Sequence, residues 1–326
     1  MSISRARASS LRESHPATLL GWRRVVARGL GCLGLGAVGL SLASLTPQPA
    51  AGQPPADMLE AMKRFSQQAE SFVPDFVREI PADQRQRLAG IHIDWRDEQQ
   101  FGRQVLESYE AQLAARQQSI KRQGRDVLYL DQLVAVIQPL MRNAQRYRKI
   151  RVGIIPSDQA DAYSIPGGDL LFTRGLLETA GSEAGLIGVV AHELSHLDRG
   201  HQLLPLKQSK LNSAPTDWRQ MMGAMAVCKP VHPEFEREAD ADALQWMLAA
   251  GYDVRELAHV LAAWDQRQNV QAPWVEVIPG FVRSHPDAGQ RAQDLLRGYD
   301  RWAGGRDLYV GRENLQRRIP RDKQRF

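Results

Sequence analysis

The sequence is poor in cysteine, in internal repeats and in net charge beyond its first residues, and each lack argues against a class of protein. Two cysteines in 326 residues cannot build a disulfide framework. No internal repeat is present, which argues against an attached module of helical repeats. Residues 1–29 carry a net charge of +5 and residues 30–56 carry none, so residues 57–326 sum to zero and a general nucleic-acid binder is not indicated. The 43% hydrophobic and 24% charged residues exclude collagen-like, wholly disordered and polytopic membrane proteins.

The first part of the sequence is typical of an export signal followed by a linker. A basic stretch, residues 1–29, precedes a 16-residue apolar run over residues 30–45. This run is shorter than the ~20 apolar residues of a membrane-spanning helix and close to the ~7–15 of a signal sequence. We therefore interpret residues 1–45 as a secretory signal, with an uncleaved membrane anchor as the alternative, and expect the domain in the periplasm or on the periplasmic face of the membrane. Four prolines indicate an extended linker over residues 46–56.

The remaining sequence predicts an α+β, mostly helical fold with a small β-sheet. We expect a helical region over residues 57–145, a core over residues 146–297 and a loosely held basic tail over residues 298–326. Strands are predicted at 150–155 and 170–173, with Pro166-Gly167-Gly168 between them as a type II turn. The predicted helices cover residues 97–123, 128–141, 182–200, 234–250, 254–266 and 288–296, and residues 202–233 are predicted to be irregular.

A metal-binding pattern lies in the helix predicted over residues 182–200. His192 and His196 are four residues apart, so their imidazoles project from one helix face and can reach the same metal ion. Glu193 lies beside them and can take a proton from a water bound to that metal. A catalytic Zn²⁺ site needs three protein ligands and an open position for water, so a third ligand must come from elsewhere in the chain.

The third ligand is expected at Glu236. His201 is less suitable because it lies five residues past His196, about 140° further round a helix, and we expect it at the helix C-terminus interacting with the dipole. Glu236 and Asp240 are one turn apart on the same face of a later helix. Glu236 can therefore bind the metal while Asp240 accepts a hydrogen bond from the far nitrogen of a ligand histidine. A solvated acidic helix start is the alternative for this stretch, and Glu238 is expected at the surface.

Over residues 146–296 the sequence resembles the zinc metallopeptidases of the HtpX and CAAX prenyl protease type, within the gluzincins. Four features, in this order along the chain, carry the resemblance. They are the Pro166-Gly167-Gly168 turn, the His192-Glu193-Leu194-Ser195-His196 helix, the stretch from Glu236 to Asp240, and His285-Pro286 followed by Arg291. The resemblance implies a zincin-like metallopeptidase domain with one Zn²⁺ per chain. Only one apolar run is present, so the sequence is most similar to the exported bacterial branch.

The resemblance also implies further site residues. His285 or Arg291 would donate a hydrogen bond to the oxyanion of the reaction, and His285 can instead bind the zinc in a resting state. A loop turn at His285 and a salt bridge at Arg291 are the alternatives. Asp161-Ala162-Tyr163 stands where the family usually has Asn-Ala-Phe, and we expect these residues to form a strand edge that lines the zinc cleft and pairs with substrate. A covered edge with Tyr163 in the core is the alternative.

Two functions are compatible with this pattern. The first is a zinc-dependent endopeptidase, for which the resemblance implies misfolded or unassembled cell-envelope proteins as substrates. No nucleic-acid partner is expected, and the N-terminal segment can associate with a membrane. The second is a metal-stabilised, chaperone-like binding module with little proteolytic activity. Because Glu193 is present together with the three expected ligands, the first function is favoured, and the lack of Cys-rich, four-ligand coordination argues against a structural zinc site.

Overall fold

The computed structural model describes residues 82–211, 232–270, 288–303, 305 and 307–323. The chain divides into two units, residues 1–53 and 54–326, and every described residue belongs to the second unit. The expected signal and linker therefore lie outside the described residues, as does His285. Within the described ranges, no helix has the length and apolar character needed to cross a membrane.

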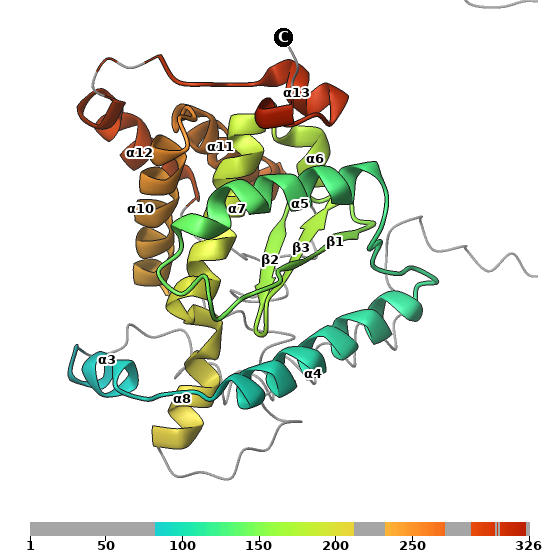
Figure 1. The fold of residues 1–326 in the computed structure, drawn as a ribbon, viewed down its shortest axis with the longest axis vertical. Coiled ribbons are helices and arrows are strands. Elements are labelled where there is room, and N and C mark those ends of the chain that lie inside the picture. The colour runs from blue at the N-terminus through green and yellow to red at the C-terminus, as the bar shows by residue number, and fades with distance from the viewer. Residues whose placement is uncertain (1–81, 212–231, 271–287, 304, 306, 324–326) are drawn as a thin grey trace, which may run out of the picture. The chain divides into compact units, whose positions relative to one another are not determined.

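A three-stranded sheet lies among the helices of the domain (Figure 1). Its strands are β1 (Arg151–Ile155), β2 (Ala162–Ile165) and β3 (Asp169–Thr173), in the order β1-β3-β2. β1 pairs parallel with β3, and β2 pairs antiparallel with β3. The two predicted strands are therefore present, and so is the predicted turn between β2 and β3. Gly167 has a φ of 83°, as the third position of a type II turn requires, and the Gly168 N–H donates to the Ile165 carbonyl at 3.2 Å.

Helix α7 (Glu183–Arg199) begins and ends where its local residues favour a boundary. The Ser182 hydroxyl accepts a hydrogen bond from the Gly185 N–H at 3.0 Å and caps the start of the helix. Gly200 ends the helix with a φ of 66°, a left-handed conformation that glycine adopts without steric cost. All residues of the helix except the last are buried, so α7 runs through the core. The predicted helix over residues 182–200 is confirmed.

Helices cover both faces of the sheet, and the residues of β3 divide between them (Figure 1). Leu170 and Phe172 belong to a hydrophobic cluster with α7, whereas Leu171 belongs to a second cluster with Phe101 and Val105 of α4. This alternation is the period of two that a strand imposes on its side chains. The helices that contribute buried residues to the first cluster are α5 (Arg125–Ile137), α6 (Arg174–Thr179), α7, α10 (Pro233–Ala249), α11 (Arg255–Val270), α12 (Ala288–Ala303) and α13 (Arg312–Arg317). The other described elements are α3 (Ala82–Ala89), α4 (Trp95–Ala114), η1 (Gln138–Leu140), η2 (His201–Leu203), α8 (Leu204–Leu211) and η4 (Arg321–Lys323).

Helices α4 and α8 differ from the sequence prediction. α4 ends at Ala114 instead of continuing to residue 123, because Gln117 adopts a left-handed φ of 57° just beyond the helix. Helix α8 (Leu204–Leu211) forms where the sequence predicts irregular structure. Its proline, Pro205, lies in the first turn, where the missing N–H removes no bond of the helix.

The C-terminal segment, residues 307–323, packs against the domain, so the prediction of a loosely held tail is wrong for these residues. The carbonyls of residues 310 and 311 accept hydrogen bonds from the N–H groups of Ala184 and Glu183, at 3.0 and 3.1 Å. The buried Glu183 carboxylate accepts from two tyrosine hydroxyls and from a backbone N–H of this segment. Because the first N–H groups of a helix have no partner within the helix, the segment completes the start of α7.

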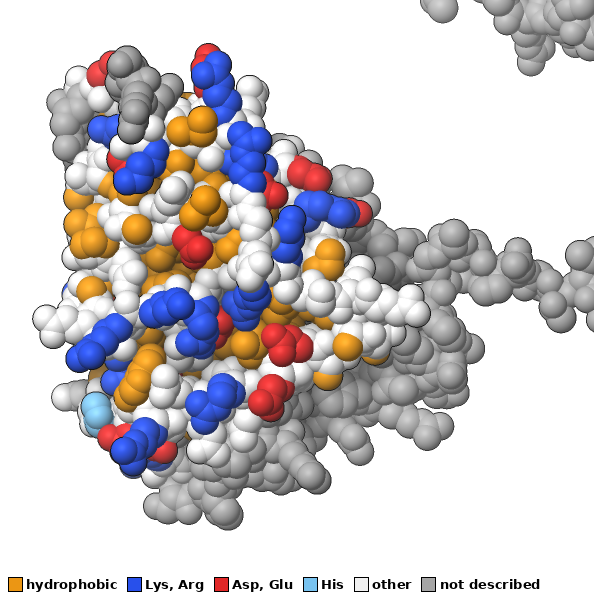
Figure 2. All heavy atoms as spheres, turned by 45° about the vertical axis from the view of Figure 1, so that its right-hand side comes forward, with side chains coloured by type: hydrophobic (Ala, Val, Ile, Leu, Met, Phe, Trp, Pro, Cys, Tyr) orange, Lys and Arg blue, Asp and Glu red, His pale blue; other side chains and the backbone are white. Residues whose placement is uncertain are grey.

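The surface of the domain mixes charges of both signs. On the face shown in Figure 2, Lys and Arg side chains are interspersed with Asp and Glu side chains and with apolar atoms. This mixture agrees with the balanced charge of residues 57–326 in the sequence.

Replacing Gly102 with alanine is expected to destabilise the fold. Gly102 lies in α4 against the turn between β2 and β3, and an added Cβ would stand 1.7 Å from the Pro166 carbonyl oxygen. Helix propensity alone would favour alanine by up to ~1 kcal/mol. Because the clash is with backbone, we expect Gly102→Ala to lower the free energy of unfolding by about 1–3 kcal/mol in urea titrations. Gly90→Ala, whose nearest atom is 3.5 Å away, is the control, and an equal or raised stability of Gly102→Ala would contradict this packing.

Candidate metal centre

His192, His196 and Glu236 lie together in a group whose ligand atoms can hold one metal ion. The Nε2 atoms of the two histidines are 3.0 Å apart, and they lie 3.4 and 3.3 Å from the two oxygens of the Glu236 carboxylate. Tetrahedral Zn²⁺ with bonds of about 2.0–2.1 Å separates its ligand atoms by about 3.3 Å. The observed separations therefore fit such an ion with little movement of the side chains.

Two packed helices bring these ligands together. His192 and His196 lie one turn apart on α7, and Glu236 comes from the first turn of α10, which packs against α7 (Figure 1). His192, Glu193 and Glu236 are at most 3% exposed, and His196 is 9% exposed. Burial lowers the pKa of His196, which favours the neutral imidazole that a metal ligand must be.

Asp240 contacts the first of the two histidines. The Nδ1 atom of His192 is 3.0 Å from an Asp240 oxygen, so an Nδ1–H can donate to the carboxylate while Nε2 faces the other ligands. Burial opposes ionisation of Asp240, but the charge and hydrogen bonds of Arg291 outweigh it and lower the pKa of Asp240 to about 2. This is the arrangement in which we expect Asp240 to orient a ligand histidine.

Arg291 is buried and donates hydrogen bonds to two carboxylates. Its Nε and Nη2 atoms each lie 2.6 Å from Asp240 oxygens, and its Nη1 lies 2.5 Å from a Glu236 oxygen. These contacts match the salt-bridge alternative and favour a role in positioning Asp240 and Glu236 over donation to an oxyanion. The sequence does not identify the partners of this salt bridge, because α12 and α10 are brought together only by the fold. His285, the other expected donor, lies outside the described residues.

His201 lies beside the site, a position that the sequence analysis did not predict. Its Nδ1 is 2.9 Å from Nδ1 of His196, and its Nε2 is 3.1 Å from an oxygen of Glu238. The 140° argument assumes a continuing helix, whereas Gly200 ends α7 and the following turn η2 carries the His201 ring back toward His196. Because the sequence already predicts that the helix ends at Gly200, it could have indicated that His201 leaves the helix and turns back toward His196. Burial lowers the pKa of His201 to about 4.

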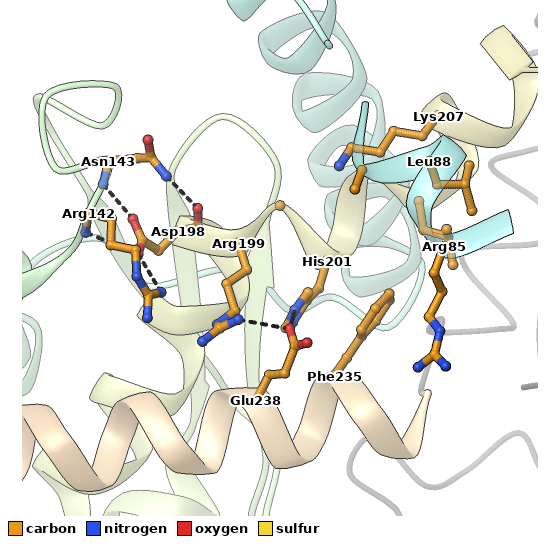
Figure 3. A pocket seen from close by; sticks show the side chains of 13 residues that line it. Arg85, Leu88, Arg142, Asn143, Asp198, Arg199, His201, Lys207, Phe235 and Glu238 are labelled. Atoms are coloured by element: carbon orange, nitrogen blue, oxygen red, sulfur yellow. Dashed lines mark hydrogen bonds and ion pairs between the residues drawn. The ribbon is translucent and has the colours of Figure 1, made fainter. Parts of the chain in front are cut away.

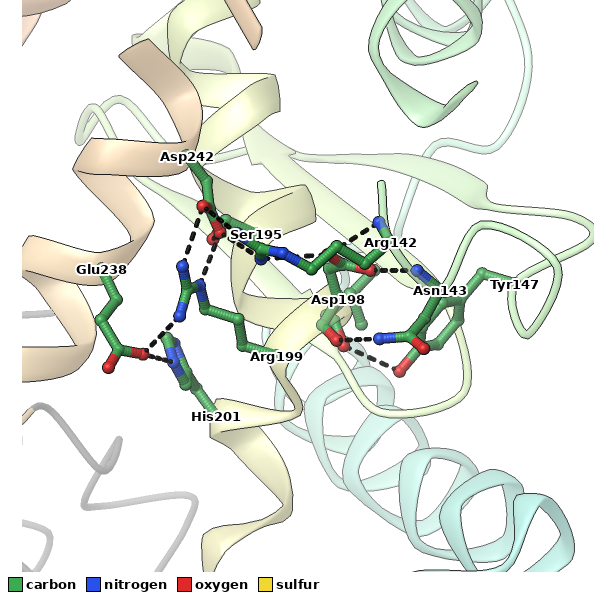
Figure 4. A network of polar contacts seen from close by, with 10 residues as sticks. Arg142, Asn143, Tyr147, Ser195, Asp198, Arg199, His201, Glu238 and Asp242 are labelled. Atoms are coloured by element: carbon green, nitrogen blue, oxygen red, sulfur yellow. Dashed lines mark hydrogen bonds and ion pairs between the residues drawn. The ribbon is translucent and has the colours of Figure 1, made fainter. Parts of the chain in front are cut away.

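A polar network joins α7 to α10 and to the chain after η1 (Figure 4). At its centre the buried Asp242 accepts hydrogen bonds from the Ser195 hydroxyl at 2.8 Å and from the guanidinium groups of Arg142 and Arg199. Asp198 accepts backbone N–H bonds from residues 142 and 143 at 3.1 and 2.7 Å. These hydrogen bonds fix the C-terminal part of α7 to α10 and to residues 142 and 143.

The Asp242 carboxylate should make stability depend on pH. Burial opposes ionisation, but the bonds from Arg199, Arg142 and Ser195 hold its pKa below the ordinary value. Since its pKa is lowered by folding, its contribution is full above the unfolded pKa of about 3.9 and is lost as the pH falls below that value. We expect Asp242→Asn to cost about 1.5–3 kcal/mol at pH 7 and progressively less toward pH 3, measured by urea unfolding.

The control for this prediction is Asp97→Asn, which removes an exposed pair with Lys210 and should cost about 0–1 kcal/mol. A loss for Asp242→Asn that stays constant between pH 7 and pH 3 would show that the carboxylate charge is not what stabilises the network.

The expected substrate edge lies in β2 and the residue before it. The Asp161 carbonyl accepts the Thr173 N–H at 3.0 Å, and the Ala162 N–H donates to the Asp161 carboxylate at 2.9 Å. β2 packs against α7, and the sheet order places it beside β3 at one side of the sheet. The half-buried Tyr163 ring packs on Tyr109, with ring centroids 5.9 Å apart, and burial raises its pKa well above 10. A role of this edge in substrate binding stays a prediction.

The region that contains the metal-binding triad is similar to known proteins. The model of the family described as Peptidase family M48 matches residues 129–298, just over half of the chain. A curated relative, the "Beta-barrel assembly-enhancing protease" of Yersinia pestis, is 22% identical over 164 residues, which cover 43% of this chain and 32% of that protein. The chain thus matches about a third of the length of this relative. The family match contains His192, His196, Glu236, Asp240 and Arg291.

Proposed function

The chain belongs to peptidase family M48 and is a metallopeptidase, and on that premise we propose that it is a zinc-dependent endopeptidase of misfolded or unassembled cell-envelope proteins. The observation that carries the proposal is the buried triad of His192, His196 and Glu236, with separations of 3.0–3.4 Å between ligand atoms. Two imidazoles and one carboxylate form the ligand set of many catalytic zinc sites. We propose one Zn²⁺ per chain.

The residues around the triad have separate roles in this proposal. When bound, Zn²⁺ would activate a water and polarise the scissile carbonyl. Glu193 takes the proton from the attacking water and returns it to the leaving amine. Its carboxylate is buried, and its charge acts to raise the pKa values of His196 and Arg291. Asp240 orients His192, while Arg291 holds Asp240 and Glu236 in place.

The proposed substrate class comes from the likeness to a relative. The name of the Yersinia pestis relative describes a protease that enhances beta-barrel assembly, and this chain matches about a third of its length. That likeness supports proteins of the cell envelope as substrates. A chain exported by the apolar run at residues 30–45 would meet such proteins in the periplasm.

The test of the chemistry is a metal and cleavage assay on the purified protein. Wild type should contain one Zn²⁺ per chain and cleave unfolded casein, a chelator should abolish cleavage, and added Zn²⁺ should restore it. Glu193→Gln is the control for a contaminating protease. A protein that binds Zn²⁺ but cleaves no unfolded substrate would favour the chaperone-like module instead.

The location is tested separately by protease protection. In intact spheroplasts, an added protease should reach residues 57–326, because the positively charged start of the chain stays on the cytoplasmic side. Disruption of the membrane should then change the digestion of this protein little, while a cytoplasmic marker becomes sensitive. Full protection of residues 57–326 in intact spheroplasts would reject the exported location.

A further inference from the structure

His201 and Glu238 form a chain of hydrogen bonds that ends on the metal ligand His196. The two Nδ1 atoms of His196 and His201 are 2.9 Å apart. His201 Nε2 is 3.1 Å from Glu238 Oε2, a contact drawn in Figures 3 and 4. The link crosses from η2, just after α7, to α10. It approaches His196 at the nitrogen that does not face the other ligands of the triad.

Metal binding by His196 fixes which atom donates and which accepts in each of these hydrogen bonds. If His196 binds the ion through Nε2, its proton lies on Nδ1, and that N–H can only donate. His201 must then accept at Nδ1 and carry its own proton on Nε2, which donates to the Glu238 carboxylate. In this arrangement each N–H of the two imidazoles that lies in these hydrogen bonds meets an acceptor. The Glu238 carboxylate is thereby linked through His201 to the imidazole of His196.

We propose that His201 and Glu238 are positioning residues that fix the tautomer and ring orientation of His196, as Asp240 does for His192. The inference rests on the proposed metal site. The usual partner of a ligand histidine is a carboxylate, a carbonyl or water. Here the Glu238 carboxylate acts on His196 through an interposed imidazole.

The surroundings of His201 and Glu238 hold them in this geometry. The His201 ring stacks on Phe235, with ring centroids 4.2 Å apart and planes inclined by 4°. Glu238 also accepts a hydrogen bond from Arg199 at 3.0 Å, and Arg199 is itself held by Asp242. The imidazole is therefore held between an aromatic face and two hydrogen-bonding neighbours, with its Nδ1 directed at His196.

Glu238, the outermost residue of this hydrogen-bonded series, borders a cavity of about 610 Å³ (Figure 3). His201, Phe235 and Glu238 line it together with residues of α3, α7 and α8. Because the Glu238 side chain is 47% exposed, it can be replaced without opening the hydrophobic core. Glu238 therefore offers a test that is independent of the buried imidazole.

The experiment measures the affinity of the metal-free protein for Zn²⁺ by competition with a chromophoric chelator. His201→Phe keeps a ring on Phe235 but removes both nitrogens, and we expect affinity to fall ~10–100-fold, with a changed visible spectrum of the Co²⁺-substituted protein. His201→Gln offers an amide acceptor and donor and should recover part of the loss. Glu238→Leu should weaken affinity, whereas Glu238→Gln, which keeps an acceptor oxygen, should stay closer to wild type.

The control is His92→Phe, because the His92 side chain is 78% exposed and lies outside the site. If wild type binds no Zn²⁺, the proposed metal site itself fails. If wild type binds and both His201→Phe and Glu238→Leu keep its affinity and Co²⁺ spectrum, the positioning role is overturned. Should His201→Phe fail to fold, as judged by circular dichroism, the difference between Glu238→Leu and Glu238→Gln decides the question.

Discussion

Alanine in place of His192, His196 or Glu236 is expected to abolish metal binding, whereas Glu193→Gln is expected to keep one metal ion per chain and lose cleavage. The ligand atoms of the first three residues lie 3.0–3.4 Å apart in a buried group, and removal of any one leaves too few ligands for a stable site. Glu193 acts on the water and not on the ion. Loss of a general base lowers the rate by ~10²–10⁴-fold.

Metal content per chain and the rate of casein cleavage, measured on the same preparations, separate the two classes of variant. Glu107→Gln, a change at an exposed position of α4, is the control and should leave both quantities at wild-type values. If Glu193→Gln lost its metal while Glu236→Ala kept it, the roles assigned to these two residues would be wrong.

The second large effect is expected from Arg291→Met, which should lower the free energy of unfolding of the metal-free protein by about 3–5 kcal/mol. Arg291 is 5% exposed and donates three hydrogen bonds of 2.5–2.6 Å to Asp240 and Glu236. Without the guanidinium, both carboxylates stay buried with their main counter-charge removed. The pKa of Asp240 should then rise from its present value of about 2.

Urea unfolding at pH 7 in the presence of a chelator measures this loss. The double variant Arg291→Met with Asp240→Asn should recover part of the stability, since one of the two buried charges is then neutral. Arg317→Met, at an arginine whose side chain is 65% exposed, is the control and should change stability little. A stability of Arg291→Met close to that of this control would mean that the buried ion pairs contribute nothing net to the fold.

Local sequence signals were sufficient for the motif helix. The start of α7 at Ser182 and its end at Gly200 follow from capping preferences, and the spacing of the histidines follows from 3.6 residues per turn. Glu236 is expected near the histidines because a catalytic zinc site needs a third protein ligand, and the three side chains lie together in the structure.

The parts that sequence reasoning missed depend on contacts between distant segments. His201 reaches His196 only because the chain turns at Gly200, so a helix projection places it on the wrong side. The pairing of Arg291 with the carboxylates of α10 depends on how α12 packs, which no local periodicity encodes. Residues 307–323 have a polar composition typical of a surface tail, yet two of their backbone carbonyls accept hydrogen bonds from the first N–H groups of α7.

The use of residues 310 and 311 to complete the start of α7 has a consequence for the order in which the protein folds. Contacts of this segment join residues 138 and 192 positions apart, as between Arg321 and Glu183 and between Arg318 and Asp126. Pairings of such long range close large loops and form late. While the chain is still being synthesised, the first N–H groups of the helix with the histidine pair therefore lack their acceptor carbonyls until residue 311 has emerged. We expect that a nascent chain cannot assemble a rigid metal centre before that point, so that proteolytic competence would arise only after nearly the whole sequence has been synthesised.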